Sequence, residues 1–196
     1  SLLIAGGFAS HFGGLAHITY THADDHFGLD DVDLRYANHG TLAGKDWLYG
    51  VLLSNTPTAE DVWNSTPSWG FPWISSRASV GPLASPVIGS LGADVAGIGA
   101  YSMWNNHLYT DVTAYRSEHA GAATPIGGTG NQFNISGAAP YWRATWQQNF
   151  ESSYLMVGTY GIYVNSFPGA VTGPEDRYVD PAFDFQYEHP FGSNLL

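Results

Sequence analysis

The sequence predicts an all-β protein, and more closely an antiparallel outer-membrane-type β-barrel, on three observations. Stretches in which apolar and polar residues alternate recur along the chain, and several approach the roughly 9–11 residues that a tilted strand needs to cross a bilayer. Charged residues make up only 12% of the chain, against about 25% in a typical soluble domain. Aromatic residues make up 15%, which is typical of barrels with aromatic girdles at both membrane interfaces.

Charge and residue content argue against several classes of protein. Six basic residues against 17 acidic ones give a net charge of −11, which argues against binding nucleic acid through a basic patch. The chain contains no cysteine, so these residues provide no disulfide, thiolate metal site or Cys-x-x-Cys-His haem attachment. No apolar run reaches the roughly 18 residues of a transmembrane helix. No nucleophile and base set, phosphate-binding loop or zinc signature is present, so we expect no catalytic residue.

The most regular stretch, residues 139–164, predicts an antiparallel hairpin. In its first half three apolar side chains alternate with three polar ones, namely Trp142, Ala144 and Trp146 with Arg143, Thr145 and Gln147. A polar turn at 149–152 leads to a second run, 154–164, that is rich in Gly, Tyr and β-branched residues. Such a hairpin fits a soluble sheet as well as a barrel, but its long strands favour the barrel.

Similar patterns predict about nine strands in all. Besides the two strands of the hairpin, they cover residues 2–8, 16–21, 31–36, 46–55, 95–104, 108–117 and 183–188. The connections near 9–14, 38–45, 105–106, 149–152 and 189–194 are the shorter ones, and those near 56–94, 118–137 and 166–177 are long. The two classes alternate, except that 21–27 is short where a long connection is due. This alternation is typical of outer-membrane barrels, with turns on the periplasmic side and loops outside.

We expect residues 1–196 to form a single β-barrel domain or a segment of a larger barrel. A segment is considered because about nine strands are predicted, whereas closed bacterial barrels normally have an even strand number. The long connection at 56–94 contains five of the eleven prolines. Its aromatic residues are expected to form either a plug in the lumen or an ordered loop on the rim. These plug or rim residues are Trp63, Trp69, Phe71 and Trp73.

The polar residues of the alternating strands are the candidates for the lumen wall. They are Asp31, Asp33, Arg35, Asp111, Arg143, Gln147, Asp184, Gln186 and Glu188. Because a charge away from water is costly, we expect carboxylates and arginines to pair across strands, either only to hold the wall together or also to give a lumen that favours cations. Asp24, Asp25 and His26 carry oxygen and imidazole ligands for weak divalent-metal binding, but a solvated acidic turn explains them too.

Three stretches, residues 33–46, 53–72 and 139–143, resemble the barrel portion of outer-membrane monohaem cytochrome–porin fusions. The likeness continues in outline at 158–161 and 173–178. It implies a location in the bacterial outer membrane and a role in extracellular electron transfer, such as iron oxidation at the cell surface. The family carries a haem c, but no residue of this cysteine-free chain matches the family's haem attachment. The resemblance therefore implies either a haem c in an upstream domain or a partner, or a barrel without a haem.

The function we expect is that of a porin-like outer-membrane β-barrel that takes part in electron transfer by housing or docking a c-type cytochrome. Membrane lipid would surround such a barrel, and nucleic acid is not an expected partner. A passive, cation-favouring porin without a redox role is the alternative. A soluble, aromatic-rich β-sandwich that binds a ligand is the third hypothesis.

Overall fold

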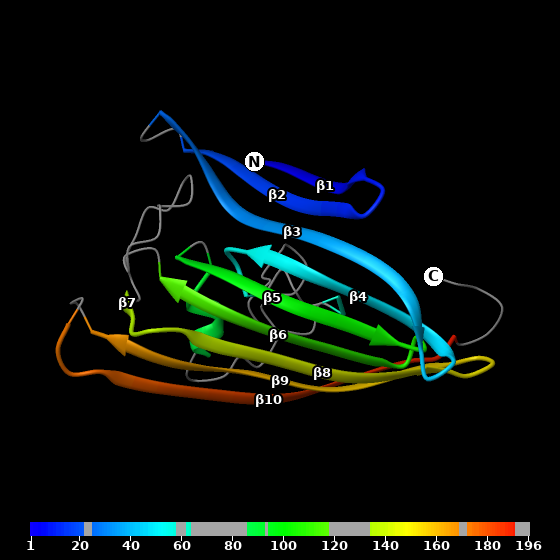
Figure 1. The fold of residues 1–196 in the computed structure, drawn as a ribbon. Coiled ribbons are helices and arrows are strands. Elements are labelled where there is room, and N and C mark those ends of the chain that lie inside the picture. Colours follow the sequence, from blue (N-terminus) through cyan, green and yellow to red (C-terminus); the bar gives the residue numbers. More distant parts are fainter. Residues whose placement is uncertain are drawn as a thin grey trace.

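The computed structural model describes residues 1–21, 25–57, 62–63, 86–92, 94–117, 134–168 and 172–190. These residues form one antiparallel sheet of ten strands and a short 3-10 helix (Figure 1). The elements are β1 (Leu2–Ala9), β2 (Phe12–Thr21), β3 (His26–Leu42), β4 (Lys45–Ser54), η1 (Val87–Ser90), β5 (Val95–Trp104), β6 (Leu108–Ser117), β7 (Asn134–Ile135), β8 (Ala139–Asn149), β9 (Tyr154–Phe167) and β10 (Asp176–Glu188). The predicted all-β antiparallel class is confirmed.

Nine of these strands follow one another as a meander, in the order β1-β2-β3-β4-β5-β6-β8-β9-β10, while the two-residue β7 pairs only with β9. The turns that join β1 to β2, β3 to β4, β5 to β6 and β8 to β9 all lie at one end of the sheet, on the right in Figure 1. The connections after β4, β6 and β9 leave from the opposite end. We call these the short-turn end and the long-loop end.

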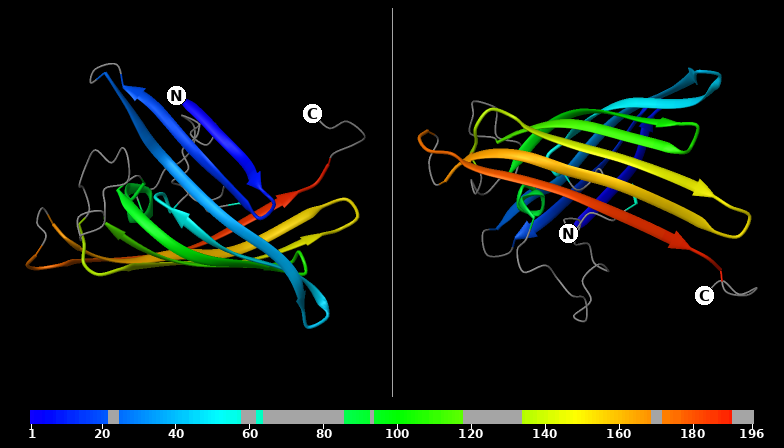
Figure 2. Two further views of the ribbon diagram at one scale, coloured as in Figure 1. Left: turned by 45° about the horizontal axis from the view of Figure 1, so that its top comes forward. Right: turned by 90° about the horizontal axis from the view of Figure 1, so that it is seen from below.

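The sheet is strongly curved but not closed in the described part of the chain. Strands β1 and β10 occupy the two ends of the strand order and do not pair with each other. Figure 2 shows that the sheet bends so that β2 and β3 rise above the other strands.

Two faces of the sheet differ in what they expose. We call the concave side, which bears Tyr115 and Tyr141, the inward face and the other side the outward face. At the long-loop end of the inward face, η1 packs with buried strand residues. This cluster comprises Val87, Ile88, Leu91, Val95, Tyr115, Ile135, Ala139, Tyr141, Tyr160, Ile162 and Val164.

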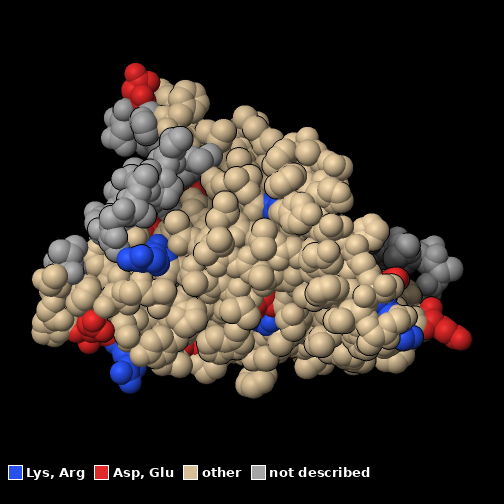
Figure 3. Space-filling model, viewed as in Figure 1, with Lys and Arg blue, Asp and Glu red and all other residues tan. Residues whose placement is uncertain are grey.

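The outward face exposes large apolar side chains instead. Ile98, Val112, Phe183 and Phe185 are 64%, 62%, 86% and 71% exposed. Figure 3 shows this face as mainly uncharged, with most of the Lys, Arg, Asp and Glu toward its two ends.

The predicted hairpin at 139–164 and the turn at 105–106 are confirmed. Strands β8 and β9 pair from Tyr141 with Ile162 to Asn149 with Tyr154. Both Asn105 and Asn106 have positive φ angles, 50° and 56°, a conformation that asparagine adopts more readily than most residues.

The predicted connection at 38–45 is wrong. Strand β3 continues to Leu42, which pairs with Lys45, so that only Ala43 and Gly44 form the turn. Both of these have positive φ angles, 53° and 73°, as in the tight two-residue turns of hairpins. The polar Asn38 and His39 resemble loop residues, but both pair with β4 because backbone hydrogen bonds do not depend on side-chain polarity.

Other strand ends also differ from the prediction. Strand β3 begins at His26 and β10 at Asp176, so the connections at 21–27 and 166–177 are shorter than predicted. The connection at 9–14 shrinks to Ser10 and His11, and β7 lies inside the predicted connection 118–137. Residues 191–196, which include most of the predicted turn at 189–194, lie outside the described residues.

Candidate functional site

The inward face brings most of the predicted lumen-wall residues together. Opposite residues of paired strands share a face, and Asp111 pairs with Arg143 while Asp184 pairs with Gly158. Asp33, Asp111 and Arg143 are buried there, at 4%, 1% and 1% exposure. The other predicted wall residues are partly buried, namely Asp31, Arg35, Gln147, Asp184 and Gln186, and Glu188 is exposed at the end of β10.

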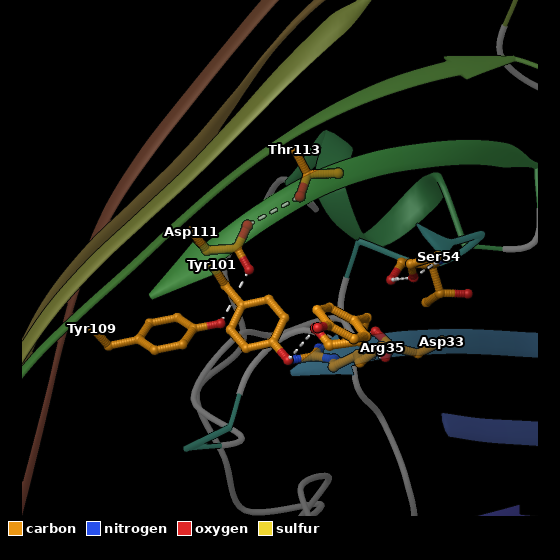
Figure 4. Close-up of polar contacts among 9 residues, drawn as sticks. Asp33, Arg35, Ser54, Tyr101, Tyr109, Asp111 and Thr113 are labelled. Carbon is orange, nitrogen blue, oxygen red and sulfur yellow. Dashed lines mark hydrogen bonds and ion pairs between the residues drawn. The ribbon is translucent and has the colours of Figure 1, made fainter. Parts of the chain in front are cut away.

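One polar group on this face is centred on Arg35. Its Nε lies 2.6 Å from Asp33 Oδ1 and its NH2 lies 3.0 Å from Asp33 Oδ2, a two-point ion pair (Figure 4). The guanidinium also lies 5.3 Å from the ring centre of Tyr101. The Tyr101 hydroxyl donates to the carbonyl oxygen of Tyr36 at 3.2 Å, which orients the ring beside the guanidinium.

Asp111, on β6, faces this group (Figure 4). Its Oδ2 accepts a hydrogen bond from the Tyr109 hydroxyl at 3.1 Å, and its Oδ1 accepts one from Thr113 Oγ1 at 3.0 Å. The three residues are spaced by two, which places them on the same face of the strand. The carboxylate is therefore satisfied by neighbours on its own strand.

A second polar group surrounds Arg143, whose side chain is fully buried. Its NH2 lies 2.6 Å from Asp184 Oδ2, across β9. Its guanidinium lies 5.2 Å from the Trp63 ring centre and 5.3 Å from the Tyr160 ring centre. A buried arginine is stabilised by an opposite charge together with aromatic faces, so this group fixes β8, β9 and β10 relative to one another.

Trp63 comes from the long connection and lies against the inward face. Its Nε1 donates to the Tyr154 hydroxyl oxygen at 2.6 Å and lies 3.2 Å from Gln147 Oε1. Its ring meets Tyr109 edge to face, with centres 5.3 Å apart. Trp69, Phe71 and Trp73, the other predicted plug or rim residues, lie outside the described residues.

The long-loop end of the inward face is apolar and covered by η1. Val87 and Ile88 are 5% and 1% exposed, and the Val87 backbone N–H donates to Asp180 Oδ2 at 2.5 Å. On this inward face, η1 therefore covers an apolar cluster that Asp180 ties to β10.

The weak metal candidates do not form a metal site in the described part of the chain. Asp25 is exposed and accepts a hydrogen bond from the Tyr20 hydroxyl at 2.7 Å. His26 begins β3, and Asp24 lies outside the described residues. No group of three or more His, Asp or Glu residues among those described is placed to hold a metal ion.

Three tyrosines beside the charged groups are the residues that the sequence prediction missed. Tyr101, Tyr109 and Tyr160 lie on the inward face beside the charges. A signal for Tyr109 was present, because it is two residues before Asp111 and so shares its face. The contact of Trp63 with Arg143 spans 80 positions of sequence and has no local signal.

No protein-family model, curated protein or solved structure shows significant similarity to this chain. No helix among the described residues has both the length and the hydropathy that a membrane-spanning helix requires.

Proposed function

We propose that this chain is part of the wall of a bacterial outer-membrane β-barrel, with its outward face in lipid. The observation that carries this proposal is the reversed distribution of polarity. The sheet buries ionic groups such as Arg143 with Asp184 on its inward face, and exposes Phe183 and Phe185 on the other. In water such a sheet would expose a large apolar surface, which monomeric soluble proteins rarely do.

Two features of the strands support the same proposal. Strands β3, β8, β9 and β10 have 17, 11, 14 and 13 residues, enough for the roughly 9–11 residues of a tilted membrane strand. Short turns gather at one end and long connections start from the other, as in bacterial barrels. The free edges of β1 and β10 would need partners in lipid, because no water is there to bond their backbone groups.

The redox role is the more specific part of the proposal, and it rests on the resemblance to cytochrome–porin fusions. The barrel would house or dock a c-type cytochrome and keep its haem apart from lipid. Intact mass and a pyridine haemochrome spectrum of the membrane-extracted native protein test this role. A c-type haem on a polypeptide heavier than 21.1 kDa is expected, whereas a haem-free barrel without a bound cytochrome would remove it.

A passive, cation-favouring porin is the second candidate, because the acidic residues of strands β4–β10 lie on the inward face. Acidic groups lining a lumen favour cations. Ion selectivity in planar bilayers tests this candidate, and a preference for anions would reject it.

The membrane placement is tested with two neighbouring residues that point to opposite faces of β10. Phe185→Cys and Gln186→Cys would each carry a fluorescent label on the full polypeptide in lipid vesicles. A quencher attached to the lipid chains is expected to quench the label at 185 and spare the label at 186. Equal, weak quenching at both positions would instead indicate a soluble sheet.

A further inference from the structure

The outward positions of strands β4–β10 carry charge of one sign only, whereas the inward positions carry acidic side chains together with Arg143. On β4–β10 every acidic side chain takes the inward position in the pairing register, from Asp46 through Asp111 to Glu188. The outward positions of the same strands carry charge only as Lys45, Arg116 and Arg177. In a chain with a net charge of −11, an outward face whose strand charges are all basic indicates attraction to an anion there.

Arg116 and Arg177 lie at the same height on the outward face, at the long-loop end. Arg116 is the last outward residue of β6, and Arg177 pairs with Asn165 near the end of β9. Continuing the registers of β6 with β8 and of β8 with β9 places Arg116 on the row of Asn165. Three strand spacings separate the two arginines, a distance of about 14 Å.

Both arginines are available to a ligand. Both are exposed, and neither forms an ion pair with an acidic side chain of the described residues. Glu175 is the acid just outside β10, and it accepts a hydrogen bond from Ser136 Oγ at 2.6 Å. The Arg177 guanidinium lies 5.9 Å from the Tyr163 ring centre, which holds it on the surface.

We propose that Arg116 and Arg177 form a binding site for the phosphate groups of anionic lipid headgroups. The site rests on the proposed membrane placement, since these arginines then lie where the apolar band meets the headgroups of the leaflet at the long-loop end. Guanidinium groups bind phosphate oxygens through two parallel hydrogen bonds. The side-chain amide of Asn165 lies on the same row between them and adds a donor.

Spin-labelled lipids test both the placement and the site. The full polypeptide is reconstituted in phosphatidylcholine vesicles that contain spin-labelled phosphatidylcholine or spin-labelled phosphatidic acid. The fraction of immobilised label gives the relative association of each lipid with the protein surface. Immobilised spin-labelled phosphatidylcholine indicates a membrane-spanning wall, because this lipid has no net negative charge and does not need the arginines. The proposed function is therefore measured separately from the phosphate site.

The wild-type protein is expected to select phosphatidic acid over phosphatidylcholine. Each of Arg116→Gln and Arg177→Gln is expected to lower that selectivity about fivefold, and the double variant about 25-fold. Lys45→Gln removes an outward charge at the short-turn end beside Asp46 and serves as the matched control. It is expected to change the selectivity for phosphatidic acid less than about twofold.

Four outcomes would overturn the proposal. Undiminished selectivity in the double variant, with phosphatidylcholine still immobilised, would remove the site and leave the membrane wall. An equal loss in Lys45→Gln would indicate general surface charge, and full displacement by excess inorganic phosphate would indicate a free-anion site. No immobilised lipid of either kind would reject the membrane placement, and the site with it.

Discussion

At the scale of single residues, glycines opposite tyrosines set how closely the strands approach on the inward face. Gly50 on β4 pairs with Tyr101 on β5, and Gly97 on β5 pairs with Tyr115 on β6. A Cβ atom on Gly50 would lie 2.6 Å from Tyr101 Cζ and would also clash with the carbonyl oxygen of Tyr36. The tyrosine ring therefore occupies the space that a side chain on the neighbouring strand would need.

Gly50→Ala is therefore expected to destabilise the sheet by about 1–3 kcal/mol, the usual cost of overpacking. The strand backbone must move, because one of the clashing atoms belongs to the main chain of β3. Urea unfolding of the full polypeptide in detergent measures the change. Gly40→Ala is the matched control, since its Cβ would meet only Tyr49 Cε1 at 4.0 Å, and equal stability of the two variants would contradict the prediction.

The buried pair of Arg143 and Asp184 supports a second prediction at this scale. Asp184→Asn removes the carboxylate 2.6 Å from a guanidinium that is fully buried. Breaking a buried pair by removing one charge costs about 3–5 kcal/mol. We expect a loss of this size in the free energy of unfolding. Asp176→Asn on the same strand is exposed and is expected to change it by less than about 0.5 kcal/mol.

At the scale of elements, the β3–β4 turn contains a local conflict between residue and conformation. Ala43 has a φ of 53°, in the left-handed region that a residue with a Cβ enters at a cost, and Gly44 follows at 73°. Asn-Gly is the preferred pair for such a turn, and Ala-Gly is not. The β3–β4 hairpin is therefore formed against the preference of one of its turn residues.

Ala43→Asn is expected to stabilise the protein by about 0.5–1 kcal/mol, because asparagine tolerates the left-handed conformation. A shift of the thermal unfolding midpoint upward would measure this gain. The reverse change at the β5–β6 turn, Asn106→Ala, is expected to lower the midpoint, since Asn106 has a φ of 56°. A midpoint that falls in Ala43→Asn would show that the turn geometry differs.

The hairpin at residues 139–164 and the β3–β4 turn show where prediction from sequence succeeds and where it fails. The strands of residues 139–164 were predictable because a strict period of two reports which face each residue takes. The turn at Ala43 was hidden because Asn38 and His39, earlier in the same strand, resemble loop residues, although both pair with β4. The inward placement of Arg143 was predictable from the alternation of side chains along its strand. Its contact with Trp63 was not, because it depends on how the distant connection at 56–94 packs on the inward face.

At the scale of the whole molecule, alternation of short and long connections was the most informative sequence signal for architecture. It predicted that the β1–β2 and β8–β9 turns would gather at one end, and Figure 1 shows them there. Closure into a barrel has no comparable signal, because it depends on strand number and on the stagger between the first and last strands. The described sheet leaves β1 and β10 as its edges.

The depth of each outward residue in the proposed bilayer leads to the last prediction. Val112 is in the middle of β6 and 62% exposed, whereas Leu108 begins the strand at the short-turn end and is 42% exposed. A lysine on the lipid face of a barrel costs about 2–4 kcal/mol at the middle of the bilayer and about 0–1 near its surface. Val112→Lys is therefore expected to destabilise the vesicle-embedded protein far more than Leu108→Lys.

Reversible unfolding of both variants from vesicles measures this difference. A soluble sheet predicts small and nearly equal effects at both positions, because exposed surface substitutions usually change stability by less than about 0.5 kcal/mol wherever they lie. Val112→Ala separates the loss of the valine from the cost of the charge. Equal, small effects of lysine at positions 108 and 112 would place the outward face in water, and the arginines at the long-loop end would then lose their lipid headgroups.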